Sequence, residues 1–172
     1  FWNHEKGYLA DFVNGGGQNV YVRPNQVIAC SLEYSPISDD MKRGVLDVVK
    51  SELLTPKGLR TLAPKNIHYE GTYEGDQATR DHAYHQGTVW PWLIGPYIEA
   101  NFRLYGKKFV KTAKELLGGF EEDMTVYGVC SIGEIYDGNP PYAPNGCISQ
   151  AWSVGEILRC MALIKKYEAG RK

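Results

Sequence analysis

The feature that most limits how this chain can fold is the alternation of helical segments with two long polar loops. Helical spacing of apolar residues predicts helices over about 26–32, 38–53, 88–105, 107–120 and 149–167. The loops, residues 55–86 and 122–148, are rich in glycine and polar side chains and show no helical periodicity. Each leads from one pair of helices to the next, so both are expected at the same end of an up-and-down helical array.

Local signals refine these expected elements. A glycine triplet separates two short apolar runs within residues 1–22 and predicts an extended or hairpin segment there. Ser38 is a good N-cap residue, and Gly106 is a natural residue after a helix end. Pro96 lies inside the helix expected over 88–105, so a kink is predicted there.

Length and charge exclude several classes of protein. A chain of 172 residues fits a single domain, residues 1–172. Its hydrophobic core is large enough to be stable without disulfide bonds. Nineteen basic and 20 acidic side chains give a net charge of −1, which argues against a nucleic-acid partner or a polybasic membrane surface. No apolar run approaches the roughly 20 residues of a spanning helix. We therefore expect neither nucleic acid nor a membrane among the partners.

The cysteines and the first residue bear on the origin of the chain. The chain opens with Phe1, without Met and without a signal-peptide pattern, so we interpret it as a fragment of a larger chain. None of the cysteines belongs to a Cys-x-x-Cys pair, and free thiols in a reducing, cytoplasmic compartment are expected. The four are Cys30, Cys130, Cys147 and Cys160.

Aromatic rings, imidazoles and a carboxylate concentrate in the segment Arg80 to Trp92. Sugars bind to such mixtures, because their C–H faces pack on aromatic rings and their hydroxyls need fixed donors and acceptors. The alternative is a helix-entry loop whose polar groups cap the backbone and whose tryptophans pack in the core. The candidate substrate-binding residues of this segment are Asp81, Tyr84, His85, Gln86 and Trp90.

A metal site in the same segment is a weaker alternative. Asp81, His82 and His85 could bind zinc or iron, but their spacing differs from that of His-Glu-x-x-His. No second cluster supplies the remaining ligands. Neither a metal nor another cofactor is therefore expected.

The second long loop holds the candidate catalytic base. Glu134 lies between Ile132 and Ile135, which indicates a partly buried carboxylate suited to general-base chemistry. Asp137 precedes Gly138, and we interpret it as a turn residue.

Four residues elsewhere complete the candidate set. Gln150, at the start of the last helix, is expected to reach the cleft, and Arg60 is a weaker candidate ligand. Arg23 either pairs with a carboxylate of the site or anchors the helix that follows it. Trp152 is expected to pack in the core.

Five motifs occur in order along nearly the whole chain: Arg23–Gln26, Leu54–Leu62, Arg80–Trp92, Gly133–Ile135 and Gln150–Ser153. Together they resemble the C-terminal part of the amylo-α-1,6-glucosidase domain of glycogen debranching enzymes. The segment that ends at Trp92 is the most specific of them. The resemblance implies an all-α fold that forms part of an (α/α)6 toroid, in which six inner and six outer helices surround a sugar cleft.

The resemblance also implies the chemistry. Such domains remove single glucose units from α-1,6 branch points with inversion, through an acid and a base, and Glu134 matches the base. The general acid lies upstream of the matched region, so the isolated chain is expected to be inactive, with Asp81 as the reserve candidate for the acid. The implied partners are glycogen-like α-glucan or an oligosaccharide, and the remainder of the parent chain.

Two other functions stay open on the sequence alone. A non-catalytic carbohydrate-binding all-α module would use the same aromatic loops. An all-α interaction domain would have no small-molecule site. Substitution of Glu134 separates the first of these from the enzyme, because a binding module would keep its affinity for sugar.

Overall fold

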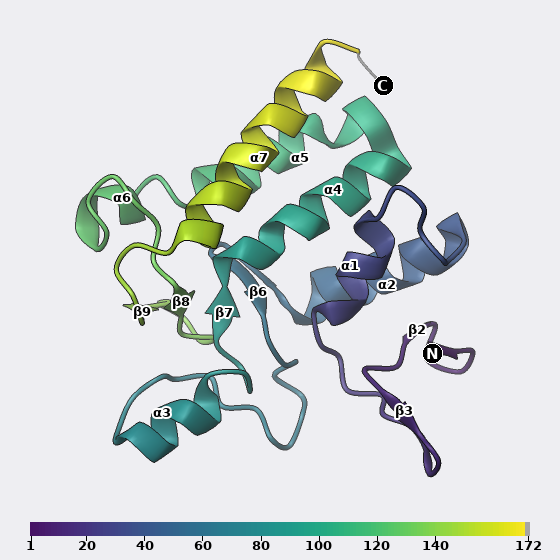
Figure 1. Ribbon diagram of the computed structural model, residues 1–172, viewed down its shortest axis with the longest axis horizontal. Helices are drawn as coiled ribbons and strands as arrows, with labels where there is room; N and C mark the ends of the chain where they lie inside the picture. Colours follow the sequence, from purple (N-terminus) through teal and green to yellow (C-terminus); the bar gives the residue numbers. More distant parts are fainter. Residues whose placement is uncertain (171–172) are drawn as a thin grey trace.

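A computed structural model describes residues 1–170, in which helices pack above a group of short strands (Figure 1). The helices are α1 (Asn25–Ser31), α2 (Asp39–Glu52), α3 (Gln77–Ala83), α4 (Ile94–Tyr105), α5 (Val110–Gly118), α6 (Asp123–Val126) and α7 (Ala151–Glu168), with short 3-10 helices η1 (Pro91–Leu93) and η2 (Gly106–Phe109). The strands are β1 (Trp2–Asn3), β2 (Tyr8–Leu9), β3 (Val13–Asn14), β4 (Gly17–Gln18), β5 (Leu54–Thr55), β6 (Gly58–Arg60), β7 (Val89–Trp90), β8 (Ile135–Tyr136) and β9 (Pro144–Asn145).

Helix α4 lies at the centre of the helical part. Helices α1, α2 and α7 all pack against it, and side chains are buried around most of its circumference. Ile98 and Phe102 are fully buried, and the Phe102 ring stacks on Tyr167 of α7 at 4.3 Å between centroids. Full burial of such side chains contributes about 1.5–3 kcal/mol each, so this contact layer dominates the stability of the scaffold.

The predicted helix ends are largely confirmed. The Ser38 hydroxyl accepts a hydrogen bond from the Met41 N–H (3.3 Å) and caps α2. Gly106 ends α4 with a φ of +53°, a conformation that favours glycine. Pro96 falls in the first turn of α4, where a missing N–H leaves no intrahelical bond unmade. Pro96 thus belongs to the first turn of α4, and the kink stays a prediction.

The helix expected from residue 88 begins later than predicted. Val89 and Trp90 form strand β7, and α4 starts only at Ile94, after η1. Trp90 has φ −112° and ψ 116°, an extended conformation, because the following Pro91 disfavours the helical region for the residue before it.

The two long loops contain a five-stranded antiparallel sheet in the order β5-β6-β7-β8-β9. The first loop and its exit supply β5 to β7, and the second supplies β8 and β9. The sheet therefore joins the loops at one end of the helical layer, as expected, and Figure 1 shows α3 at that same end. The prediction of an all-α fold is confirmed only for the helices, and the loops are not structureless.

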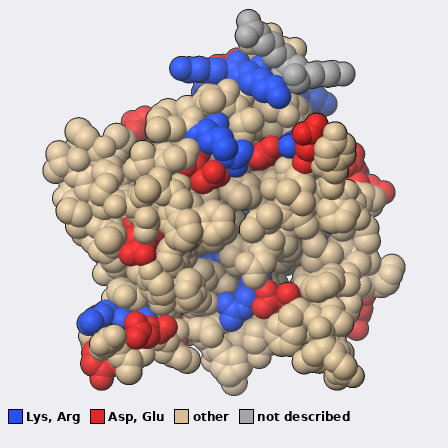
Figure 2. All heavy atoms as spheres, viewed as in Figure 1, with Lys and Arg blue, Asp and Glu red and all other residues tan. Residues whose placement is uncertain are grey.

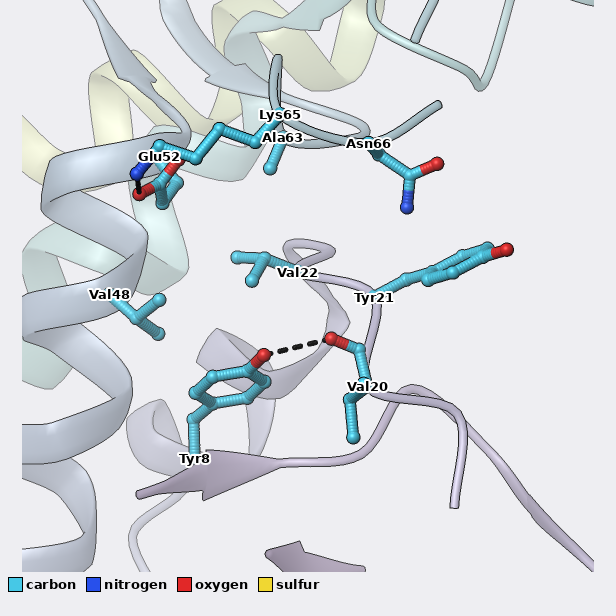
Figure 3. A pocket seen from close by; sticks show the side chains of 9 residues that line it. All are labelled: Tyr8, Val20, Tyr21, Val22, Val48, Glu52, Ala63, Lys65 and Asn66. Carbon is cyan, nitrogen blue, oxygen red and sulfur yellow. Dashed lines mark hydrogen bonds and ion pairs between the residues drawn. The ribbon is translucent and has the colours of Figure 1, made fainter. Parts of the chain in front are cut away.

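The N-terminal segment forms the expected extended region as two separate hairpins. Strand β1 pairs with β2, and β3 pairs with β4 across the glycine-rich turn. A cavity of about 320 Å³ separates this region from α2 (Figure 3). Its polar groups bond one another, since the Tyr8 hydroxyl donates to the Val20 carbonyl (2.8 Å) and Lys65 pairs with Glu52 (2.6 Å).

Helix α7 exposes apolar side chains on one face. Leu158 and Met161 are 60% and 48% exposed, and an apolar groove of about 520 Å³ runs between α5, α6 and α7. In Figure 2, charged side chains gather near the C-terminal end and around α3, while the middle of the face is mostly uncharged. Within the described residues, no helix is both long and apolar enough to cross a membrane.

All four cysteines are free thiols. Burial raises the pKa of Cys30 and of Cys160 to about 12, so both stay protonated and act as core residues. Cys130 and Cys147 are exposed in the second long loop.

Candidate active site

Glu134 lies where the two long loops meet, immediately before β8. Its backbone N–H donates to the Cys147 carbonyl (2.9 Å), and its carboxylate accepts hydrogen bonds from the Tyr84 hydroxyl and the Cys147 N–H (2.9 Å). Gly146 has a φ of +72°, and a side-chain carbon there would lie 2.5 Å from Glu134 Oε2. Glycine at 146 is therefore what lets the β9 segment approach the carboxylate so closely.

Tyr84 reaches Glu134 from the first loop, at the C-cap of α3. Its ring lies between aromatic neighbours, with centroids 4.9 Å from Trp90 and 5.8 Å from Tyr73. Its carbonyl accepts bonds from Thr88 Oγ1 (2.6 Å) and Trp90 Nε1 (3.1 Å). Burial, and secondly the bond to Glu134, raise the pKa of Tyr84, so its hydroxyl keeps its proton and acts as a donor.

His85 stacks on Trp90, with ring centroids 5.3 Å apart and planes 12° apart. The His85 side chain is exposed at its edge, whereas Trp90 is buried. Partial burial, and then the nearby Arg23 guanidinium, lower the pKa of His85, so its imidazole is neutral at neutral pH. The exposed His85 ring, backed by the buried Trp90, offers a flat face and a neutral hydrogen-bonding edge, which suits a sugar ring.

Arg23 ties the first loop to the start of α1. Its guanidinium donates to the carbonyl of His85 (2.7 Å) and to Gln86 Oε1 (2.7 Å), and it lies 3.4 Å from Asp11. Both alternatives for Arg23 therefore hold in part: it pairs with a carboxylate, that of Asp11 rather than Glu134, and it anchors the segment before α1. Gln86 is brought to the site by this contact.

Asp137 does more than form a turn. Its Oδ1 accepts from the Tyr73 N–H (2.9 Å) and from Asn145 Nδ2 (3.0 Å), so it joins the first loop to the β8–β9 hairpin. Burial raises the pKa of Asp137. The sequence interpretation of Asp137 missed this bridging role.

The other candidate residues are placed differently. Arg60 donates from Nε to the Gly138 carbonyl (2.8 Å), and the Gln150 side chain accepts from the Ala151 N–H (3.0 Å) as the N-cap of α7. Asp81 is exposed on α3 and, within residues 1–170, makes no hydrogen bond or ion pair. Both Arg60 and Gln150 thus have structural partners, and Asp81 stands outside the group around Glu134. Their roles toward substrate stay predictions.

Trp152 is not in the core, contrary to expectation. It is half exposed in the first turn of α7, with its ring 5.9 Å from Trp90 and stacked on Trp92 at 5.5 Å and 29°. The sequence held a signal for this position. Glu156 and Arg159 follow Trp152 at the i+4 and i+7 positions, so Trp152 belongs to the polar face of the helix.

Within the described residues, no group of three His, Cys, Asp or Glu side chains is arranged to hold a metal ion. The alternative in which Asp81, His82 and His85 bind a metal therefore gains no support from the geometry. The chemistry that remains is that of a carboxylate, phenols, imidazoles and indoles.

A helical scaffold whose loops present a hydrogen-bonded carboxylate beside stacked aromatic rings defines a helical glycoside hydrolase domain. The chain belongs to the amylo-alpha-1,6-glucosidase family, which it matches over residues 1–159. This confirms the resemblance seen in the motifs.

Two proteins similar to this chain are much longer than it is. It is 27% identical over 105 residues to a glycogen debranching enzyme of Saccharomyces cerevisiae, covering 56% of this chain and 7% of that protein. Neutral trehalase Nth1 from Saccharomyces cerevisiae has a similar fold, with a TM-score of 0.64 and 13% identity over 98% of this chain and 29% of that chain. The likeness to trehalase concerns the fold alone. This chain thus spans a small part of either protein.

Proposed function

We propose that the chain is the base-bearing part of an amylo-α-1,6-glucosidase, which removes glucose from α-1,6 branch points of glycogen-like α-glucan with inversion. The observation that carries the proposal is the pair of donors on Glu134. Both the Tyr84 hydroxyl and the Cys147 N–H donate to its carboxylate. One donor binds each carboxylate oxygen, so the two hydrogen bonds fix the orientation of the group that is to act as general base.

In this reaction Glu134 takes a proton from water while the water oxygen bonds to the anomeric carbon. The glycosidic C–O bond breaks on the opposite face, and the leaving oxygen takes a proton from a carboxylic acid roughly 6.5–9.5 Å away from the base. We place that acid in the remainder of the parent chain. The chain alone is then inactive.

The terminal glucose is proposed to lie against the stacked His85 and Trp90 rings, with Gln86 as a hydrogen-bonding partner. Tyr84 is better placed to orient Glu134 than to contact sugar, because its hydroxyl already donates to the carboxylate. Asp81, Arg60 and Gln150 are proposed only as outer contacts of the substrate.

We further propose that the remainder of a longer, cytoplasmic chain covers the exposed apolar face of α7. Exposed patches of this kind mark interaction surfaces, and the groove between α5, α6 and α7 continues the patch. The isolated chain should therefore bind an apolar fluorescent dye, and the complete enzyme should not. Failure of the isolated chain to bind the dye would contradict this part of the proposal.

The reaction is tested with the complete enzyme and a dextrin that carries single α-1,6-linked glucose stubs. Proton NMR should detect β-glucose as the first product, and the Glu134→Gln variant should release almost none. First-formed α-glucose would exclude inversion. Sugar binding without any glucose release by the unaltered enzyme would favour the carbohydrate-binding module instead.

A further inference from the structure

The main-chain group that donates to Glu134 is itself held on its other side by a tyrosine. The Cys147 N–H, which donates to Glu134 Oε2 (2.9 Å), belongs to the same trans peptide group as the Gly146 carbonyl. That carbonyl accepts a hydrogen bond from the Tyr127 hydroxyl (2.9 Å). The N–H and C=O of a trans peptide point in opposite directions, so Tyr127 and Glu134 bind opposite sides of one planar group.

This peptide group needs such a restraint, because the chain is flexible in front of it. Gly146 has a φ of +72°, and glycine can take several backbone conformations at nearly equal cost. The pairing of β8 with β9 ends at Asn145, and the next main-chain bond joins the Glu134 N–H to the Cys147 carbonyl. Between these two points, the Tyr127 hydroxyl fixes the rotation of the peptide at its carbonyl end.

Tyr127 is placed by a short helix that is anchored at its first residue. It is the C-cap of α6, where its N–H donates to the Asp123 carbonyl (3.1 Å). The Asp123 carboxylate pairs with Lys57 of the β5–β6 turn at 2.8 Å, and both side chains are nearly buried. A helix of four residues is marginal by itself. The ion pair therefore holds α6, and with it Tyr127, against the sheet.

The Tyr127 ring lies against the backbone just before Glu134. A side-chain carbon at Gly133 would lie 3.2 Å from this ring, so the absence of a side chain at 133 makes room for it. Partial burial, and secondly the nearby Cys147 and Glu134, raise the pKa of Tyr127, so its hydroxyl stays protonated and acts as a donor. The ring thus touches the segment that carries the carboxylate, while the hydroxyl holds the peptide that bonds it.

We propose that Tyr127 is a positioning residue for the reaction at Glu134, acting through the peptide group between Gly146 and Cys147. Hydrogen bonds in series polarise one another, so the bond to the carbonyl strengthens the N–H as a donor and keeps the carboxylate in one orientation. The inference rests on the proposed function and deepens it, because it adds a residue that acts on the base without bonding to its carboxylate.

The test uses Tyr127→Phe in the complete enzyme, which removes the hydroxyl and keeps the ring. The kcat for glucose release from the dextrin with α-1,6-linked stubs should fall about three- to tenfold, the factor of one ordinary hydrogen bond, and KM should not change. Hydrogen exchange, followed by mass spectrometry, should become faster in peptides that contain residues 146–148, because the peptide group is no longer held at its carbonyl.

Tyr8→Phe is the matched control. The Tyr8 hydroxyl also donates to a main-chain carbonyl, that of Val20, at 2.8 Å (Figure 3). It belongs to β2, which lies across the molecule from β8 in Figure 1. This variant should leave kcat, KM and the exchange of residues 146–148 unchanged.

An unaltered kcat in Tyr127→Phe would overturn the proposal, as would unaltered exchange at residues 146–148. An equal loss of kcat in Tyr8→Phe would also overturn it, since the position of the lost hydroxyl would then not matter. A rise in KM at constant kcat would mean that Tyr127 contacts sugar instead. Thermal melting checks that each variant is folded. If the proposed function itself fails, the unaltered enzyme releases no glucose, whereas exchange at residues 146–148 still responds to Tyr127→Phe.

Discussion

The helical layer and the loop end of the molecule are held together by different interactions. Around α4, fully buried apolar side chains such as Val45, Ile98 and Phe102 supply the contacts. Around Glu134, the buried Ile132 and Ile135 continue this core, and hydrogen bonds, ring stacking and the close backbone approach at Gly146 are added to it. Apolar burial is strong but unspecific in direction, whereas hydrogen bonds fix the direction of each group. The directional contacts that fix the site geometry are thus concentrated at the loop end.

An ion pair joins the sheet to the helical layer. Lys57, in the β5–β6 turn, donates to the Gly119 carbonyl (2.7 Å) and pairs with Asp123 (2.8 Å). Both side chains are nearly buried, so the pair fixes the sheet to the end of α5. Removal of one partner would leave the other charge buried without compensation.

Among the substitutions that distinguish the loop end from the helical layer, Glu134→Gln is expected to have the largest effect. In the complete enzyme, Glu134→Gln should lower kcat by about 10²–10⁴-fold, because the amide cannot accept a proton from water. The melting temperature should fall only slightly, since Gln keeps the shape but has one acceptor oxygen where Glu134 has two. Initial rates of glucose release and thermal melting measure the two quantities. A near-normal kcat, together with loss of activity in Asp137→Asn, would move the base to Asp137.

A substitution in the helical layer should lower stability instead of activity. Phe102→Ala should lower the free energy of unfolding by about 3–5 kcal/mol, because it opens a cavity beneath α7. Denaturant unfolding measures this loss, and Leu158→Ala, an exposed truncation on α7, should cost within about 0.5 kcal/mol. Equal costs for the two variants would mean that α4 is not the centre of the core.

Tyr84→Phe tests whether the hydrogen bond to Glu134 contributes to activity at the loop end. Loss of a hydrogen bond to a charged group should lower kcat about 10–100-fold with little change in KM.

Tyr69→Phe is the matched control for Tyr84→Phe. It removes a hydroxyl that bonds Asn139 (3.0 Å) and joins the same two loops without contact to Glu134. It should leave kcat unchanged. A similar loss in both variants would show that loop tethering, and not the bond to Glu134, is what matters.

The smallest expected effect concerns Asp137. Burial raises its pKa above the ordinary value of 3.8, so the folded protein binds this proton more tightly than the unfolded chain. The resulting stabilisation is complete below the unfolded pKa and is lost as the pH rises through the folded pKa. Asp137→Asn keeps an acceptor for Tyr73 and Asn145 and should be slightly more stable than the parent chain at pH 7, with the advantage shrinking toward pH 4. Urea unfolding at both pH values measures it, and a variant less stable at pH 7 would mean that the charge itself stabilises the loops.

The sequence predicts α1, α2, α4, α5 and α7, whose signals are long or sharp, but it misses α3 and α6 inside the long loops. Ser38 marks the start of α2 through its hydroxyl, and Gly106 marks the end of α4 through its conformation. The sheet could not be predicted in the same way. Each strand has two or three residues, too few for alternation, and the pairings of β7 with β6 and with β8 join residues far apart in the chain. At Val89 and Trp90 the spacing of apolar residues predicted a helix, although Pro91 favours an extended conformation for the residue before it.

Within the site, the sequence identifies residues but not their partners. Glu134 and Tyr84 are both found from their surroundings in the sequence, yet 50 residues separate them, and nothing in the spacing predicts their hydrogen bond. The tie of Asp137 to Tyr73 is hidden for the same reason. Trp152 is the exception, since its helix face could have been derived from Glu156 and Arg159.

One of the two donors on Glu134 belongs to the main chain. The Cys147 N–H is present whatever side chain stands at that position, so evolution can exchange the thiol freely without altering this contact. Proline alone lacks the N–H and would delete the bond. Every residue except proline can therefore supply the N–H at position 147. Alkylation of the exposed Cys147 sulfur likewise leaves this N–H donor in place.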